Sequence, residues 1–188
     1  MKNNKVVLYI AMSLDGYIAK PDGSVDWLFD VEGDGGDNGY AEFYKTIGTC
    51  VMGRLTYDEV LKLSDDFPYA NVPCYVLSRS EQPSAPHVTF TDEALDTLIP
   101  ELKRTSEGDV WLVGGGQLVA AFLESSLIEE LYIAVIPKVL GEGIPLFPEG
   151  TVPSTFQLTD VQKLGQMVML SYKAESHEDH PPSIQSKS

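Results

Sequence analysis

The chain is organised as apolar runs separated by polar stretches, and these runs predict a series of β-strands. The first run, 5–12 (KVVLYIAM), is rich in β-branched and aromatic residues, which is typical of a strand buried on both faces of a sheet. Comparable runs predict further strands at 49–52, 74–78, 87–90, 110–113, 131–136, 156–161 and 168–172. The first strand of the chain is therefore predicted to lie in the hydrophobic core.

Helical periodicity separates the early strands. One apolar helical face combines residues spaced i, i+3, i+4 and i+7, namely Tyr40, Phe43, Tyr44 and Ile47. Thr56 and Glu59 have the spacing of a capping box, which predicts a helix start at Thr56 and makes Gly53 and Arg54 the preceding turn.

Two more helices are predicted in the second half of the chain. The first carries an apolar face of Leu95, Leu98, Ile99 and Leu102, and Pro100 is expected to bend or shorten it. The second, 117–124, follows the strand 110–113 and three glycines. Alternating strands and helices followed by paired strands predict an α/β fold, with a mainly parallel central sheet, helices on both faces and antiparallel C-terminal edge strands.

Composition supports one globular domain, expected over 1–174, with a flexible acidic and polar tail over 175–188. The 188 residues include 28 Asp plus Glu against 13 Lys plus Arg, a net charge of −15, which disfavours nucleic acid and anionic membranes as partners. The first apolar run is too short for a signal peptide core or membrane span, so a cytoplasmic location is expected. Cys50 and Cys74 lie far from any CxxC spacing and read as buried thiols.

Three turns after predicted strands carry small or basic residues. They contain Gly53, Arg54 and Thr56, then Ser78, Arg79 and Ser80, then Gly114, Gly115, Gly116 and Gln117. Ligands of open α/β sheets bind at the carboxyl ends of the strands, where guanidinium groups and helix N-termini can hold a phosphate. Together the turns predict a phosphorylated ligand, although a single glycine turn usually serves the backbone and a single arginine at a strand end is usually a solvated surface charge.

Two other motifs are incomplete. Gly114–Gly116 imitates the start of a G-x-G-x-x-G fingerprint, but Val119 stands at the third glycine position. The segment 30–42 (DVEGDGGDNGYAE) imitates a calcium-binding EF-hand loop, but its twelfth position is Ala41 and no entering helix is predicted. A calcium-binding protein remains an alternative, and no metal ligand is assigned.

Five short motifs, read in order, resemble the dihydrofolate reductase superfamily, and most closely its branch related to the reductase domain of bifunctional riboflavin-biosynthesis deaminase-reductases. They are SLDGYIA (13–19), MGRLTY (52–57), VLSR (76–79), VGGGQL (113–118) and GEGIPLF (141–147). The resemblance covers about residues 6–172 and implies a dihydrofolate reductase-like fold. No zinc motif of a deaminase accompanies it.

The resemblance implies an NADPH site. Gly53, Arg54 and Thr56 would lie near the pyrophosphate, Ser78 and Arg79 near the adenosine 2′-phosphate, and Gly114, Gly115, Gly116, Gln117 and Leu118 along the other side. Ala11, Ile18 and Ala19 would flank the nicotinamide, and Gly114 and Gly115 would join through a cis peptide.

The same resemblance implies a stand-alone NADPH-dependent reductase of a small heterocycle, either pterin-like or like 5-amino-6-(5-phosphoribosylamino)uracil. Asp37 falls about where a proton-supplying carboxylate would lie, and Tyr40 and Tyr44 could stack on a flat substrate. A homodimer is also implied. A binding module that retains the NADPH site without catalysis is the alternative from another functional class.

Overall fold

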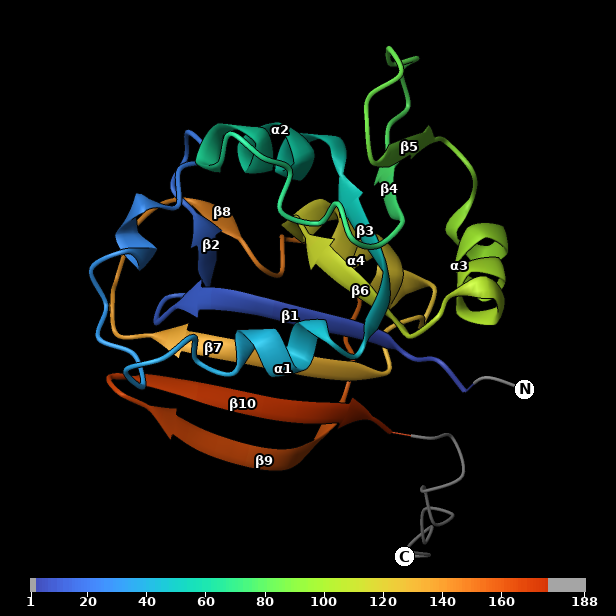
Figure 1. Cartoon of the computed structure of the whole chain (residues 1–188). Coiled ribbons are helices and arrows are strands. Elements are labelled where there is room, and N and C mark those ends of the chain that lie inside the picture. The colour runs from blue at the N-terminus through green and yellow to red at the C-terminus, as the bar shows by residue number, and fades with distance from the viewer. Residues whose placement is uncertain (1–2, 176–188) are drawn as a thin grey trace, which may run out of the picture.

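The computed structural model describes residues 3–175, which form an eight-stranded sheet, a two-stranded sheet and flanking helices (Figure 1). In spatial order the large sheet contains β5 (Val88–Thr91), β4 (Cys74–Leu77), β3 (Ile47–Gly53), β6 (Asp109–Gly114), β1 (Val6–Ser13), β7 (Glu130–Ile136), β10 (Met167–Ala174) and β9 (Phe156–Leu164). The pairs from β5 to β7 are parallel, whereas β10 is antiparallel to both β7 and β9. This confirms the predicted mainly parallel sheet with an antiparallel C-terminal edge.

The remaining elements are short. They are β2 (Tyr17–Ala19), the 3-10 helix η1 (Asp26–Leu28), α1 (Tyr40–Tyr44), α2 (Arg54–Leu63), α3 (Leu95–Thr105), α4 (Gly116–Glu124) and β8 (Ile144–Pro145). The antiparallel pair of β2 and β8 was not predicted, because strands of three and two residues are too short to carry an alternating pattern.

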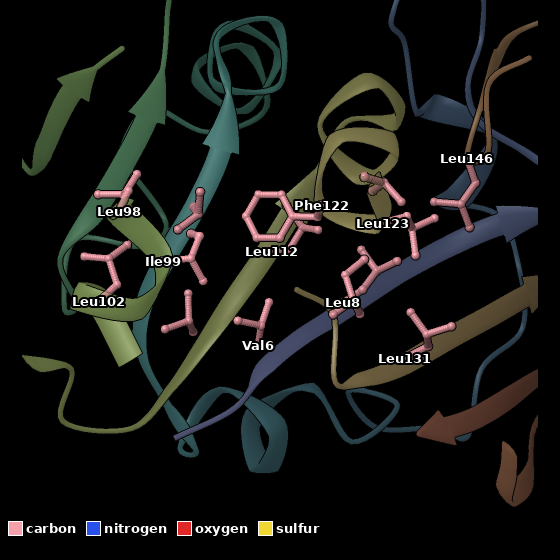
Figure 2. Close-up of a cluster of buried hydrophobic side chains, with 14 of the residues drawn as sticks. Val6, Leu8, Leu98, Ile99, Leu102, Leu112, Phe122, Leu123, Leu131 and Leu146 are labelled. Atoms are coloured by element: carbon pink, nitrogen blue, oxygen red, sulfur yellow. The ribbon is translucent and has the colours of Figure 1, made fainter. Parts of the chain in front are cut away.

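Helices cover both faces of the large sheet, as predicted. Alternate residues of a strand point to opposite faces, so Leu8 of β1 packs on one side and Tyr9 on the other. On the first side, α3 and α4 bury Ile99 and Phe122 against the sheet, as Figure 2 shows. The second side is covered by α1 and α2 with an aromatic layer. The site described below therefore rests on a sheet that is packed from both sides.

The aromatic layer corrects the predicted extent of the first helix. Tyr40, Phe43 and Tyr44 do share one helical face, but α1 ends at Tyr44 and Ile47 already begins β3. The ring of Phe43 stacks on Tyr9 with centroids 4.0 Å apart, and Trp111 meets Phe43 edge-on at 5.2 Å. One helical turn is enough to place these rings, because their packing on the sheet supplies the stability that so short a helix lacks.

The predicted start of α2 at Thr56 is wrong. The helix begins at Arg54, with Gly53 in an extended conformation at its N-cap and no side-chain capping bond, so the capping box of Thr56 and Glu59 does not form. Because β3 ends at Gly53 and glycine is an acceptable N-cap, the helix follows the strand without a separate turn. Thr56 consequently lies inside the first turn of the helix.

Pro100 does not shorten α3. The helix continues through the proline to Thr105, and Leu98, Ile99 and Leu102 are all buried. Burial of this apolar face outweighs the hydrogen bond that proline cannot donate.

The division into a domain and a tail stays a prediction. Residues 176–188 lie outside the described residues. Within residues 3–175, no helix has the length and apolar character needed to cross a membrane.

Candidate functional site

The three glycine- or arginine-containing turns converge at the carboxyl edge of the parallel strands. In the register of β3 with its neighbours, Gly53 lies opposite Leu77 of β4, and Met52 lies opposite Gly114 of β6. Ser78 follows Leu77 directly, so residues far apart in sequence meet at adjacent strand ends. This is the edge at which open α/β sheets bind their ligands.

The three consecutive glycines differ in their surroundings. The peptide bond between Gly114 and Gly115 is cis, as the family resemblance implied. A Cβ atom on Gly115 would lie 3.2 Å from Thr56 Oγ1, whereas a Cβ atom on Gly116 would lie 2.2 Å from the backbone oxygen of Pro145. Gly115 therefore lies close to Thr56 in the first turn of α2, and Gly116 allows α4 to pack against β8.

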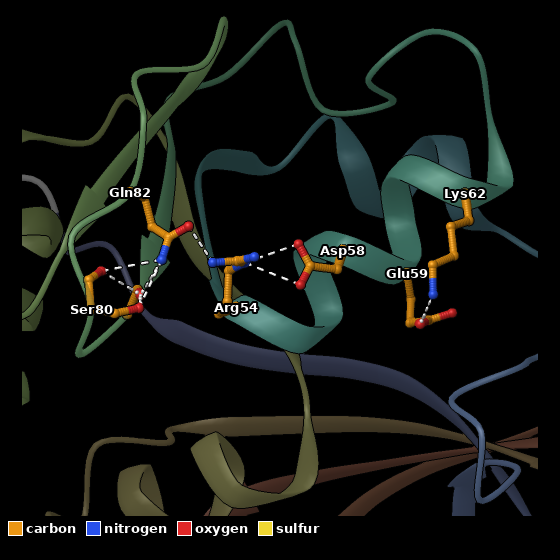
Figure 3. Close-up of polar contacts among 7 residues, drawn as sticks. Arg54, Asp58, Glu59, Lys62, Ser80 and Gln82 are labelled. Carbon is orange, nitrogen blue, oxygen red and sulfur yellow. Dashed lines mark hydrogen bonds and ion pairs between the residues drawn. The ribbon is translucent and has the colours of Figure 1, made fainter.

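Arg54 joins the β3 turn to the β4 turn through side-chain hydrogen bonds (Figure 3). Its Nε donates to both carboxylate oxygens of Asp58, at 2.9 and 3.0 Å, and its Nη1 donates to Oε1 of Gln82. The Gln82 amide nitrogen in turn donates to Ser80 Oγ at 2.8 Å and lies 3.4 Å from Ser78 Oγ. The Arg54 guanidinium therefore lies beside the turn of Ser78–Ser80, where the 2′-phosphate is expected.

Arg79 presents its positive charge to solvent. The residue is exposed, and no acidic side chain within the described part of the chain forms an ion pair with it. Because Arg54 is already paired with Asp58, Arg79 contributes the uncompensated charge at this edge. A phosphate binding here would meet one free guanidinium and one that is already positioned.

The other predicted cofactor residues lie around the same edge. Ala11 is in β1 and packs toward Trp27, while Ile18 and buried Ala19 belong to β2. In the first turn of α4, Gln117 is exposed and Leu118 packs against the core. These residues thus belong to β1, β2 and α4, and their contact with a cofactor stays a prediction.

Asp37 lies just before α1 and has a clear local role. Its carboxylate accepts the backbone N–H groups of Gly39 and Ala41 at 3.0 and 2.7 Å, which satisfies donors at the start of the helix. Burial raises the pKa of Tyr9, and the negative charge of Asp37 raises this pKa further. The following helix α1 packs on Tyr9 through Phe43, and Tyr9 and Ala11 share one face of β1. Asp37 therefore lies next to the helix that covers this face.

Tyr40 and Tyr44 are engaged by other aromatic side chains. Their rings stack on each other with centroids 5.8 Å apart, and both contact Trp111. Burial is the main reason that the pKa of Tyr40 rises to about 12. Within the described residues, the buried Tyr44 hydroxyl group has no hydrogen-bond partner. Stacking of these rings on a substrate stays a prediction.

The acidic segment 30–42 uses its carboxylates within the protein. Asp30 pairs with Lys138, and Asp34 accepts the backbone N–H groups of Gly36 and Asn38. Among residues 3–175, no group of three or more His, Cys, Asp or Glu side chains is arranged to hold a metal ion. Two of the carboxylates that imitate a calcium loop thus have partners within the protein, Asp30 in a lysine side chain and Asp34 in nearby backbone N–H groups.

Asp15, in the SLDGYIA segment, connects two loops. Its carboxylate accepts a hydrogen bond from Ser13 Oγ at 2.6 Å and from the backbone N–H groups of Leu140 and Gly141. The Ser13 bond, followed by the backbone bonds, holds the pKa of Asp15 below its ordinary value. The Asp15 carboxylate therefore joins the loop after β1 to the loop after β7.

A groove of about 320 Å³ lies between the loop around η1 and the end of α2. Its lining includes Asp22, Asp26, Phe29, Glu59, Lys62 and Leu63. Lys62 is paired with Glu59, and Lys20 beside the groove is paired with Asp26. The groove offers apolar surface next to Asp26 and Glu59, which already have cationic partners.

Sequence reasoning missed Asp58 and Gln82. Asp58 could have been found, because an acidic residue four positions after an arginine on a helix is placed to pair with it. Gln82 carries no such signal, since it lies between β4 and β5 in a segment without helix or strand.

The sheet order and the converging turns define a dihydrofolate reductase-like domain of the reductase type. The chain belongs to the RibD C-terminal domain family, whose model matches residues 4–170. This membership supports a reductase-type function.

Individual relatives agree with this assignment. The chain is 46% identical over 169 residues to the uncharacterized protein YwjB of Bacillus subtilis, covering 89% of this chain and 97% of that protein. The crystal structure of a putative riboflavin biosynthesis protein from Shewanella sp. PV-4 is 30% identical, with a TM-score of 0.82, and covers 92% of this chain and 99% of that one.

A more distant likeness concerns the fold. A diaminohydroxyphosphoribosylaminopyrimidine deaminase/5-amino-6-(5-phosphoribosylamino)uracil reductase from Thermotoga maritima is 20% identical, with a TM-score of 0.68. The match covers 92% of this chain but 57% of that protein, so the present chain corresponds to little more than half of it.

Proposed function

We propose that this protein is an NADPH-dependent reductase of a small heterocyclic substrate, pterin-like or similar to 5-amino-6-(5-phosphoribosylamino)uracil. The observation that carries the proposal is the meeting of Arg54, Ser78 and the Gly114–Gly115 turn at one strand edge. The phosphoribosylaminopyrimidine class is further supported by the name of the Thermotoga maritima protein with the same fold.

The residues at this edge fit a phosphorylated dinucleotide. Two guanidinium groups and the hydroxyl groups of Ser78 and Ser80 provide donors for a phosphate in a protein of net charge −15. The turn at Gly115 leaves room that a single methyl group would narrow. When bound, NADPH supplies the hydride, and the protein supplies binding, orientation and the route for a proton.

Replacing Arg79 by alanine tests the cofactor preference. We expect NADPH affinity to fall by about tenfold to a hundredfold, the effect of losing a charge-assisted hydrogen bond worth about 1.5 to 3 kcal/mol. NADH affinity should hardly change, because NADH lacks the 2′-phosphate. Isothermal titration with both dinucleotides measures the difference, and an equal loss for both would show that Arg79 does not distinguish them.

Asp37 is the proposed source of the proton. It lies just before α1, which packs on the face of β1 that also carries Ala11, the residue proposed to flank the nicotinamide. A carboxyl group in this position can donate a proton to the substrate atom that becomes basic during reduction, directly or through a water molecule. Tyr40 and Tyr44 are proposed to border the heterocycle from α1.

Turnover decides between an enzyme and a binding module. Titration of the wild-type protein with NADPH should reveal saturable binding, and NADPH oxidation should follow addition of a pterin or ribosylaminopyrimidine from a substrate panel. Saturable binding without oxidation on any heterocycle of the panel would favour the non-catalytic alternative. A thermal shift with calcium and none with NADPH would contradict the reductase proposal.

We also propose a homodimer, formed through the C-terminal strands. In the pairing of β9 with β10, Val161 lies opposite Leu170 and Leu158 lies opposite Tyr172, so these side chains share a face with Val168. Leu158 and Val161 are 52% and 54% exposed. An apolar row on an edge strand is suited to burial by a second copy.

Val161→Glu is expected to weaken this dimer. Two carboxylates brought into one symmetric interface repel each other and lose hydration, so the dissociation constant should rise at least about tenfold. Sedimentation velocity over a concentration series measures the change. Gln162→Glu adds the same charge on the opposite face of β9 and should leave the dimer intact. A monomeric wild-type protein would contradict the proposal.

A further inference from the structure

Gln82 occupies the centre of the polar cluster that links α2 to the turn after β4 (Figure 3). Its amide oxygen accepts the hydrogen bond from Arg54 Nη1, and its amide nitrogen donates to Ser80 Oγ at 2.8 Å and to the Ser80 backbone oxygen at 3.3 Å. One neutral side chain thus engages both the guanidinium and the serine turn.

The Gln82 amide oxygen, which faces Arg54, accepts hydrogen bonds as a phosphate oxygen does but carries no formal charge. A guanidinium offers several N–H donors in one plane, and Asp58 already takes the Nε donor with both carboxylate oxygens. The Nη1 donor of Arg54 is therefore left for a second acceptor, which is the amide oxygen of Gln82. A phosphate oxygen would form a stronger, charge-assisted bond at the same donor.

The hydroxyl groups of Ser78 and Ser80 can form hydrogen bonds either with Gln82 or with a bound anion. Ser80 Oγ accepts the hydrogen bond from Gln82 Nε2, and Ser78 Oγ donates to the Ser80 backbone oxygen at 2.9 Å. A hydroxyl hydrogen rotates freely about its C–O bond, so both groups can donate to an anion that takes the place of the amide. Departure of Gln82 would leave Arg54, Ser78 and Ser80 facing the bound anion, next to exposed Arg79.

We propose that Gln82 is a neutral placeholder for the 2′-phosphate of NADPH and thereby limits the preference of the site for NADPH over NADH. The inference rests on the proposed function. Because the amide must leave Arg54 before the phosphate binds, Gln82 lowers NADPH affinity slightly, while the pairing with Asp58 keeps the guanidinium in place. The segment between β4 and β5 contains neither helix nor strand, so it can release the side chain without disturbing the sheet.

Two substitutions at position 82 should act in opposite directions. Gln82→Ala removes the competing acceptor and should tighten NADPH binding about twofold to tenfold, the range for one neutral hydrogen bond. Gln82→Glu places a fixed carboxylate on Arg54 and should weaken NADPH binding by about tenfold or more. NADH affinity should stay within about twofold in both variants, because NADH brings no phosphate to this position.

Binding is measured by isothermal titration with NADPH and NADH, and then with adenosine 2′,5′-bisphosphate and adenosine 5′-monophosphate. The bisphosphate should reproduce the opposite shifts and the monophosphate should not, which assigns the effect to the 2′-phosphate. Gln157→Glu, on the edge strand β9 at the other end of the sheet, carries the same charge change and should bind like the wild type. Circular dichroism confirms that the variants are folded.

Several results would overturn the placeholder role. Weaker NADPH binding by Gln82→Ala would mean that the amide contacts the phosphate or holds Arg54 in place. Equal changes for NADPH and NADH, or no change in either variant, would remove Gln82 from cofactor selection while leaving the proposed function intact. A wild-type protein that binds neither dinucleotide would defeat the proposed function and this inference together.

Discussion

Asp37→Asn is expected to lower turnover by roughly a hundredfold to ten-thousandfold, the usual contribution of a positioned general acid. The Asp37 carboxylate also accepts the N–H groups of Gly39 and Ala41, so a loss of activity could in principle come from the helix. The two N–H groups bind different oxygens of Asp37, so asparagine removes the proton, keeps one acceptor oxygen and loses one of the two bonds. NADPH affinity should stay within about twofold, because the carboxylate is proposed to act on the substrate and not on the cofactor.

The pH dependence separates proton delivery from structural damage. The loss in Asp37→Asn should shrink as the pH falls, because a substrate can then take its proton from solvent. Steady-state rates between about pH 5 and 8 measure this trend. Asp34→Asn is the matched control, since Asp34 lies in the same acidic segment and also accepts backbone N–H groups. Wild-type turnover by Asp37→Asn throughout this range would show that another group supplies the proton.

Gly115→Ala should abolish cofactor binding in a protein that remains folded. The backbone of Gly115 has a φ of −90°, which alanine adopts readily. The added Cβ atom would lie 3.2 Å from Thr56 Oγ1, in the space between the β6 turn and α2. We expect NADPH affinity to fall at least about a hundredfold, or ~3 kcal/mol, because the methyl group narrows the path of the dinucleotide.

Gly116→Ala provides the contrast to this variant. Its Cβ atom would lie 2.2 Å from the Pro145 backbone oxygen, so α4 could no longer pack against β8 and the melting temperature should fall. Thermal unfolding and NADPH titration of both variants separate the two roles. Normal NADPH binding by Gly115→Ala would show that the triple glycine forms only a permissive turn.

Local sequence patterns were sufficient to predict most of the elements. The continuous apolar run of β1 correctly predicted a central strand, because its side chains pack into the core on both faces of the sheet. The glycines after β6 correctly predicted the turn before α4. Patterns that depend on single residues failed more often. Thr56 has the spacing of a helix cap but lies within α2, and Pro100 did not end α3 because the face around it is buried.

Part of the candidate site was likewise predictable from local sequence patterns, and part was visible only in the tertiary structure. The sequence by itself determined a mainly parallel α/β fold, and it predicted a site at Gly53, Arg54, Ser78, Arg79 and the 114–116 glycines, since turn residues after apolar runs are recognisable one segment at a time. Only the tertiary structure decided that Arg54 reaches the β4 turn through Gln82, that Asp15 clasps two loops, and that Gly116 serves packing. These contacts join residues from separate elements, and their distances follow from strand register and side-chain packing, which no local pattern encodes.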